Sequence, residues 1–431
     1  MWSWFARALR GVDLAAAWEV AETLRPSFSE RFLLRPSEGH TSVRAPLPCL
    51  RKGFRPFFWL AAVFAIAIVP TWLLILGGKL QATSYLDATS WHAHEMVFGF
   101  VVAVIAGFLL TAVGNWTQRE TAIGMPLLAL AGLWLAGRLA MACSAALPAG
   151  VVAVADLAFL PALFIALARP VISAKNRRNY VILGVVAAFF VANLWLHLTA
   201  LGISSAGSAR QPSLIGVDLV VLLITIILGR VLPMFTRNAV GATSVRAIPL
   251  LDKCAIGSVA ALCLADALAP ATSVAGAVAV LAGLFSLARA SHWGARHSLQ
   301  QPLLWILHAG QAWLVVGLLL RGAALLGAPA LASPAMHALT VGAIGSLTLG
   351  MMARVALGHT GRLLTVPKSI AVAFLALNLA ALVRVLVPLL APAWYFAGLV
   401  ATATLWVTAF AIFVVVYTPI LASPRVDGKP G

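Results

Sequence analysis

The stretch HAHEMVFGFVVAVIAGFLLTAV, residues 92–113, decides the fold class, because its 18 residues from Met96 onward carry no charged side chain. The hydrocarbon core of a bilayer is about 30 Å thick and requires roughly 20 mostly apolar residues per helix. Backbone polar groups inside that core must be satisfied within the segment. The stretch therefore predicts a membrane-spanning helix, and it begins with two histidines and a glutamate that are costly in such a place.

The whole chain shares this apolar character. Of its 431 residues, 62% are hydrophobic and only 10% are charged, far from the balance of a soluble domain. About twelve apolar stretches of sufficient length follow one another, separated by short polar breaks. We predict an all-α fold, a polytopic membrane helix bundle whose main partner is the lipid bilayer. The spans are expected near residues 57–77, 92–113, 124–142, 148–168, 180–201, 214–235, 249–269, 270–288, 303–326, 334–357, 370–390 and 392–421.

Lysine and arginine are distributed unevenly between the connections. The N-terminal part, the even-numbered connections and the tail hold 22 of them, whereas the odd-numbered connections hold two, Lys79 and Arg210. Because cytoplasmic loops are enriched in Lys and Arg, we expect both termini on the cytoplasmic side. The net charge of +17 then reflects orientation, and no nucleic-acid partner is expected. The predicted parts are a cytoplasmic segment (1–52), a twelve-helix transmembrane domain (53–421) and a cytoplasmic tail (422–431).

Once each span has a direction, the helix rise of about 1.5 Å per residue places four histidines near the outer face. These are His92, His94, His197 and His337. Neutral imidazole binds haem iron, copper or zinc, so we predict a metal or haem site there, with Glu95 orienting a histidine or moving protons. His92 and His94 point about 200° apart on a regular helix, so only one of them should face a given partner. Singly, such histidines can also cap helices, bond carbonyls of neighbouring helices or line a polar pore.

A second polar group lies at the cytoplasmic helix ends. His359 follows His337 by 22 residues, roughly 33 Å along a helix, and therefore cannot share the outer site. His308, Arg230 and Arg354 fall at the same level as His359. This group can form a second metal site, receive haem propionates or lock helix ends together, and we favour the last.

Several buried charges are predicted to pair. Arg138 and Asp156 fall in the outer halves of consecutive spans and are expected to form a buried ion pair. Arg321 and Arg384 also fall in outer halves. They can meet carboxylates such as Asp218, or a haem propionate.

Several motifs of this chain resemble the NnrS family. They are residues 53–58 (GFRPFF), 91–96 (WHAHEM), 107–112 (GFLLTA), 115–117 (NWT), Arg230 with 233–236 (PMFT), and His337 through Arg354 to 357–362 (LGHTGR). The resemblance runs from residue 53 to about residue 365. It implies a multi-pass protein of the bacterial cytoplasmic membrane, linked to the nitric oxide response and denitrification, with haem and copper as cofactors. It does not assign the ligands.

The predicted function is therefore a haem- and copper-binding membrane protein involved in the response to, or the metabolism of, nitric oxide or a related small molecule. Whether it is an enzyme stays open. The alternative is a secondary transporter or metal exporter with a histidine-lined pathway, since twelve spans with both ends inside suit many transporters. The absorption spectrum of the purified protein separates the two, because a Soret band favours haem.

Overall fold

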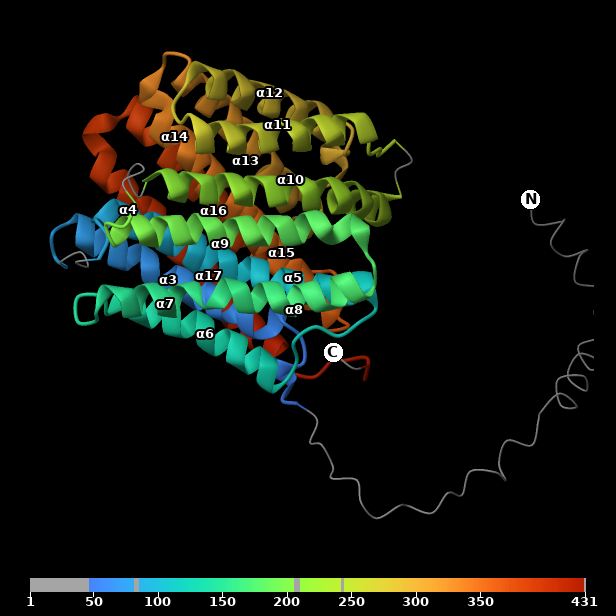
Figure 1. Cartoon of the computed structure of the whole chain (residues 1–431). Helices are drawn as coiled ribbons and strands as arrows, with labels where there is room; N and C mark the ends of the chain where they lie inside the picture. The colour runs from blue at the N-terminus through green and yellow to red at the C-terminus, as the bar shows by residue number, and fades with distance from the viewer. Residues whose placement is uncertain (1–45, 81–84, 205–209, 242–243, 430–431) are drawn as a thin grey trace, which may run out of the picture. The chain divides into compact units, whose positions relative to one another are not determined.

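A computed structural model describes residues 46–80, 85–204, 210–241 and 244–429 of this chain. Most of the predicted cytoplasmic segment 1–52 lies outside the described residues. The described part contains helices and connections, with no strand among them, which confirms the predicted all-α fold class. In Figure 1 the long helices run side by side with their axes roughly parallel.

The first half of the bundle contains six helical rods, two of them built from more than one element. They are α3 (Phe54–Leu76); α4 (Ala88–His94), which continues through the π-helical segment η2 (Glu95–Val101) into α5 (Val102–Thr117); α6 (Met125–Ala142); α7 (Ala149–Leu157), which continues into α8 (Phe159–Ser173); α9 (Tyr180–Ala200); and α10 (Arg210–Val240).

The second half also contains six rods. They are α11 (Pro249–Leu268); α12 (Ser273–Ala290); α13 (Pro302–Leu325); α14 (Ala332–His337), which continues through the π-helical segment η6 (Ala338–Gly345) into α15 (Ser346–His359); α16 (Lys368–Leu390); and α17 (Tyr395–Ala422). Breaks fall between α11 and α12 and between α16 and α17, at the two prolines, Pro270 and Pro392, where the sequence predicts them.

Eleven helices in the described part of the chain are long and apolar enough to cross a membrane. The twelfth rod, α11, is 20 residues long and carries Asp252, Lys253 and Asp266. It packs between α10 and α12. The chain is thus a many-span membrane protein, and the expected set of about twelve long helices is present, with the charged α11 as the exception in composition.

The two rods that contain π-helical turns are the most enclosed of the eleven spans. The buried share of the apolar window is 83% for Ala88–Thr117 and 78% for Pro329–His359, against 22% for Phe54–Leu76. In each of these rods the π-helical segment starts directly after a histidine, His94 or His337. Short π-helical turns inside α-helices are rare and are frequently found at functional sites. The histidines that precede these π-helical segments, His94 and His337, are therefore candidate functional residues.

Candidate metal centre

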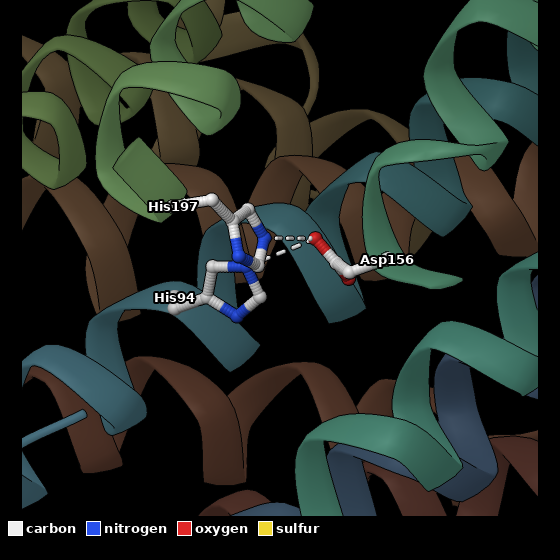
Figure 2. Close-up of side chains that lie close together, drawn as sticks. All are labelled: His94, Asp156 and His197. Atoms are coloured by element: carbon white, nitrogen blue, oxygen red, sulfur yellow. Dashed lines mark hydrogen bonds and ion pairs between the residues drawn. The ribbon is translucent and has the colours of Figure 1, made fainter. Parts of the chain in front are cut away.

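Three helices bring two histidines and an aspartate together in a small buried cluster. His94 ends α4, Asp156 lies in α7 and His197 lies near the end of α9 (Figure 2). One ligand atom from each residue lies within 4.8 Å of the other two. Both histidines are 0% exposed and Asp156 is 3% exposed. We call these three residues the histidine–aspartate centre.

The Nε2 atoms of both rings face the same carboxylate oxygen. Asp156 Oδ2 lies 3.2 Å from His94 Nε2 and 2.9 Å from His197 Nε2. Asn193 precedes His197 by one helical turn and therefore shares its face of α9. The Asn193 side chain donates to Asp156 Oδ2 at 2.7 Å, and its Oδ1 lies 3.1 Å from His94 Nε2. Nitrogen and oxygen ligand atoms thus converge from three helices.

The other nitrogen of each ring is held by a second partner. His94 Nδ1 lies 2.8 Å from Glu95 Oε1, and His197 Nδ1 lies 2.7 Å from the Tyr85 hydroxyl. An ionised carboxylate only accepts, so Glu95 places the proton of His94 on Nδ1. A phenol oxygen can accept in the same way from His197. Asp156 Oδ2 also only accepts, so a metal ion bound at that oxygen would take the place of a proton on Nε2 and would receive both Nε2 lone pairs, as in metal-binding histidines whose second nitrogen donates to a carboxylate or another acceptor.

A single arginine compensates part of the negative charge. Arg138, from α6, donates to Glu95 Oε1 at 2.5 Å and also bonds to Asp156 Oδ1, which confirms the predicted Arg138–Asp156 ion pair. With neutral imidazoles the groups sum to one negative charge, because one guanidinium faces two carboxylates. Arg138 is only 6% exposed. A buried uncompensated charge is costly, and a bound cation would remove it.

The contact between Glu95 and His94 lies at the start of the π-helical segment. On a regular helix, Glu95 shares a face with His92, three residues earlier. Here the α-helix ends at His94, and Glu95 begins the π-helical segment with its carboxylate on His94. The Trp134 indole donates to the Gly99 carbonyl at 3.0 Å within this segment. The wider turn is therefore supported by a hydrogen bond from α6.

The other two histidines of the predicted outer group lie outside this centre. His92 stacks on Trp72 with ring centroids 4.6 Å apart and 15° between the planes, and its Nδ1 is buried without a hydrogen-bond partner in the described part of the chain. His337 Nδ1 donates to the carbonyl of Ser333 at 2.8 Å. The structure thus brings His94 and His197 together but does not add His92 or His337. The expected divergence of His92 and His94 is present.

The predicted cytoplasmic group is dispersed among separate partners. Arg230 donates to Asn179 at 2.8 Å, and the Arg354 guanidinium lies 3.9 Å from the centroid of the Phe235 ring. His308 Nε2 lies 3.0 Å from the Thr236 hydroxyl, and the His359 ring packs against Phe54. The one candidate metal-ligand group in the described part of the chain contains none of them. These contacts are of the kind that lock helix ends.

Sequence reasoning missed Asp156 as a member of the centre, and Asn193 and Tyr85 as residues that contact it. Asp156 is predicted as the partner of Arg138 but not as a ligand. Asn193 carries a usable signal, because it lies four residues before His197 on an apolar helix. Tyr85 lies in the connection before α4, where no helical periodicity relates it to His197.

These features define a class, a polytopic helical membrane protein with a candidate metal centre enclosed between its helices. A model of the family described as NnrS protein matches residues 48–425. The chain therefore belongs to the NnrS family, as the motifs of its sequence indicate. No curated protein matches it.

Proposed function

We propose that the histidine–aspartate centre binds one copper ion, and that the chain is a metal-binding membrane protein of the cellular response to nitric oxide. One observation carries the proposal. Both Nε2 atoms converge on Asp156, while both Nδ1 atoms are already held by Glu95 and Tyr85. This is the arrangement that prepares a histidine to bind a metal.

Charge and ligand type support copper. Imidazole suits copper, zinc and iron, and among these the family resemblance implies copper. With neutral imidazoles, Glu95, Asp156 and Arg138 together carry one negative charge. A monovalent copper ion would bring the site to neutrality, and a divalent ion would leave one positive charge. Copper bound there would supply a redox-active centre able to take nitric oxide. His94, His197 and Asp156 would hold it, with Asn193 beside them.

Haem, which the resemblance also implies, does not fit between His94 and His197. Their Nε2 atoms lie within 3.2 Å of the same oxygen of Asp156. Arg138 and Asn193 both hold that aspartate in place. A macrocycle would have to displace the whole cluster.

We therefore place haem at the second outer pair, His92 and His337. The Nδ1–H of His337 is used by the Ser333 carbonyl, which leaves Nε2 as the ligand nitrogen. His337 also lies within electrostatic range of His92 and Arg384. The Arg384 guanidinium would suit an anionic propionate, as the sequence suggests.

Enclosure favours a resident ion over a transport pathway. His94 and His197 are 0% exposed, and each of their nitrogens has a partner within the bundle. Histidines that line a pathway must be reachable from water at some stage. This arrangement therefore supports the cofactor hypothesis over the transporter alternative.

The experiment is metal analysis of the full chain purified in lipid nanodiscs. We expect about one copper per chain, lost in His94→Ala and in His197→Ala but retained in His308→Ala, a matched control in which a buried histidine has one hydroxyl partner. A Soret band should disappear in His337→Ala. Copper-dependent changes of the spectrum on adding nitric oxide should be absent from His197→Ala. Full copper content in both centre variants would exclude this site.

A further inference from the structure

A second buried cluster of charges lies on α10, α11 and α13. Arg321 donates from Nη2 to Asp266 Oδ2 at 2.5 Å and from Nη1 to Asp218 Oδ1. Both aspartates are 1% exposed and Arg321 is 6% exposed. The proposed metal centre uses none of these residues. We call Asp218 and Asp266 the carboxyl pair.

The carboxyl pair has more acceptors than donors. One guanidinium faces two carboxylates, so the cluster carries one negative charge when both aspartates are ionised. Asp218 Oδ2 and Asp266 Oδ1 are buried and have no hydrogen-bond donor in the described part of the chain. Both carboxyl groups bond to the same guanidinium, which holds them close together. Two ionised carboxylates held close together repel, and this repulsion favours a proton on one of the two groups.

We infer that Asp218 and Asp266 share one proton at neutral pH, which makes this pair a proton-binding site inside the helix bundle. The proton satisfies one of the two buried oxygens that have no donor, and the cluster becomes neutral. A metal cation would need more oxygen ligands than these two. The inference goes beyond the proposed function, since it concerns a different cluster and a different ligand.

The surroundings of the pair are consistent with this assignment. The charged and titratable groups facing Asp218 in the described part of the chain are Arg321 from α13 and Asp266 from α11. The Cys263 thiol, one turn before Asp266 on α11, faces the same group. No imidazole is among them, so no metal-binding nitrogen competes with the proton.

The pair lies near the start of α10 and the end of α11. Asp266 lies two residues before the end of α11, and Asp218 lies eight residues after the start of α10, about 12 Å along the axis. The Gln211 side chain bonds to the Asp266 carbonyl at 3.1 Å and joins the two helix ends. The pair is therefore one or two turns from the bundle end at which α10 begins.

The test is infrared spectroscopy of the full chain in lipid at neutral pH. The wild type should show the carbonyl stretching band of a protonated carboxylic acid, which shifts in D₂O. Asp218→Asn and Asp266→Asn should each lose it, because one carboxylate then remains to pair with Arg321. Asp252→Asn is the matched control, an aspartate on α11 paired with Arg289, and should keep the band.

Thermal unfolding gives a second measurement. Each single Asn variant should unfold within a few degrees of the wild type, because an amide replaces a neutral acid of the same shape. Exchanging sodium for choline should leave the unfolding temperature unchanged. Persistence of the band in both Asn variants, its absence from the wild type, or a sodium-dependent rise in unfolding temperature would overturn the inference.

Discussion

The cluster around Arg138 and the cluster around Arg321 start from the same charges. In each, one guanidinium lies between two carboxylates that come from other helices. Both arginines and all four carboxylates are buried. The surroundings differ. Two imidazoles and an amide face Asp156 in the first cluster, whereas the Cys263 thiol faces the carboxylates of the second.

The same net negative charge can thus be compensated by two different kinds of cation inside a membrane protein. Imidazole nitrogens provide lone pairs for a metal ion, so the first cluster can accept a cation together with its ligands. Among the described residues, the second cluster has two carboxyl oxygens without donors and no imidazole nitrogen beside them, so the smallest cation, a proton, suffices. Around these two buried arginines the neighbouring residues, more than the charges, decide the ligand.

Removal of either arginine should give the largest effect. Arg138→Met and Arg321→Met each leave two buried carboxylates without their cation, and the free energy of unfolding should fall by about 3–5 kcal/mol. Copper during expression should restore part of the folded yield of Arg138→Met but none of that of Arg321→Met. Size-exclusion profiles of the detergent-extracted protein measure the yield. Equal rescue of both variants would remove the distinction between the clusters.

The second-largest expected effect is stabilisation by copper, which should depend on the cluster around Arg138 and not on the cluster around Arg321. A ligand that binds only the folded state at 100 times its Kd adds about 2.7 kcal/mol to the free energy of unfolding. We expect copper to raise the unfolding temperature of the wild type and of Asp218→Asn alike. His94→Ala should show no such rise. The comparison fails if copper stabilises His94→Ala as strongly as the wild type.

Most of the fold was predictable from sequence because long apolar runs and their polar breaks leave few alternatives in a bilayer. The breaks at Pro270 and Pro392 and the Arg138–Asp156 pair follow from such patterns. The complete set of residues that forms the metal centre could not be predicted from these patterns. Depth along a helix is readable from residue numbers, but the direction of a side chain around the axis depends on the helix type.

The partner of Glu95, at the start of a π-helical segment, is one example. Regular helical spacing pairs Glu95 with His92, whereas the structure pairs it with His94. Of the four histidines that the sequence predicts at one depth, the structure brings His94 and His197 together and leaves His92 and His337 outside their cluster. Helical spacing does not predict a π-helical turn. It also does not predict the contact of Tyr85 with His197, because Tyr85 lies in a connection without periodicity.

Tyr85→Phe should weaken copper binding without abolishing it. The variant removes the hydroxyl beside His197 Nδ1 and keeps the ring, and loss of such an outer hydrogen bond typically lowers metal affinity about 10- to 100-fold. Competition with a chelator of known affinity measures the change. Tyr417→Phe is the control, because its buried hydroxyl has no partner in the described residues. Equal affinities for Tyr85→Phe and wild type would show that the hydroxyl does not orient His197.

The smallest effect should come from Gly99, whose lack of a side chain lets α6 approach the π-helical segment. A Cβ at Gly99 would lie 2.8 Å from Phe64 Cε1 and 3.0 Å from Arg138 Nη1. Gly99→Ala should therefore displace the guanidinium from Glu95 and cost about 1 kcal/mol in stability, with a few-fold loss of copper affinity. Gly132→Ala on α6, where a Cβ meets nothing within 4 Å, should leave both unchanged. Because neither glycine touches the Arg321 cluster, the infrared band of the carboxyl pair should persist in both variants, and its loss from Gly99→Ala would mean that the two clusters are coupled.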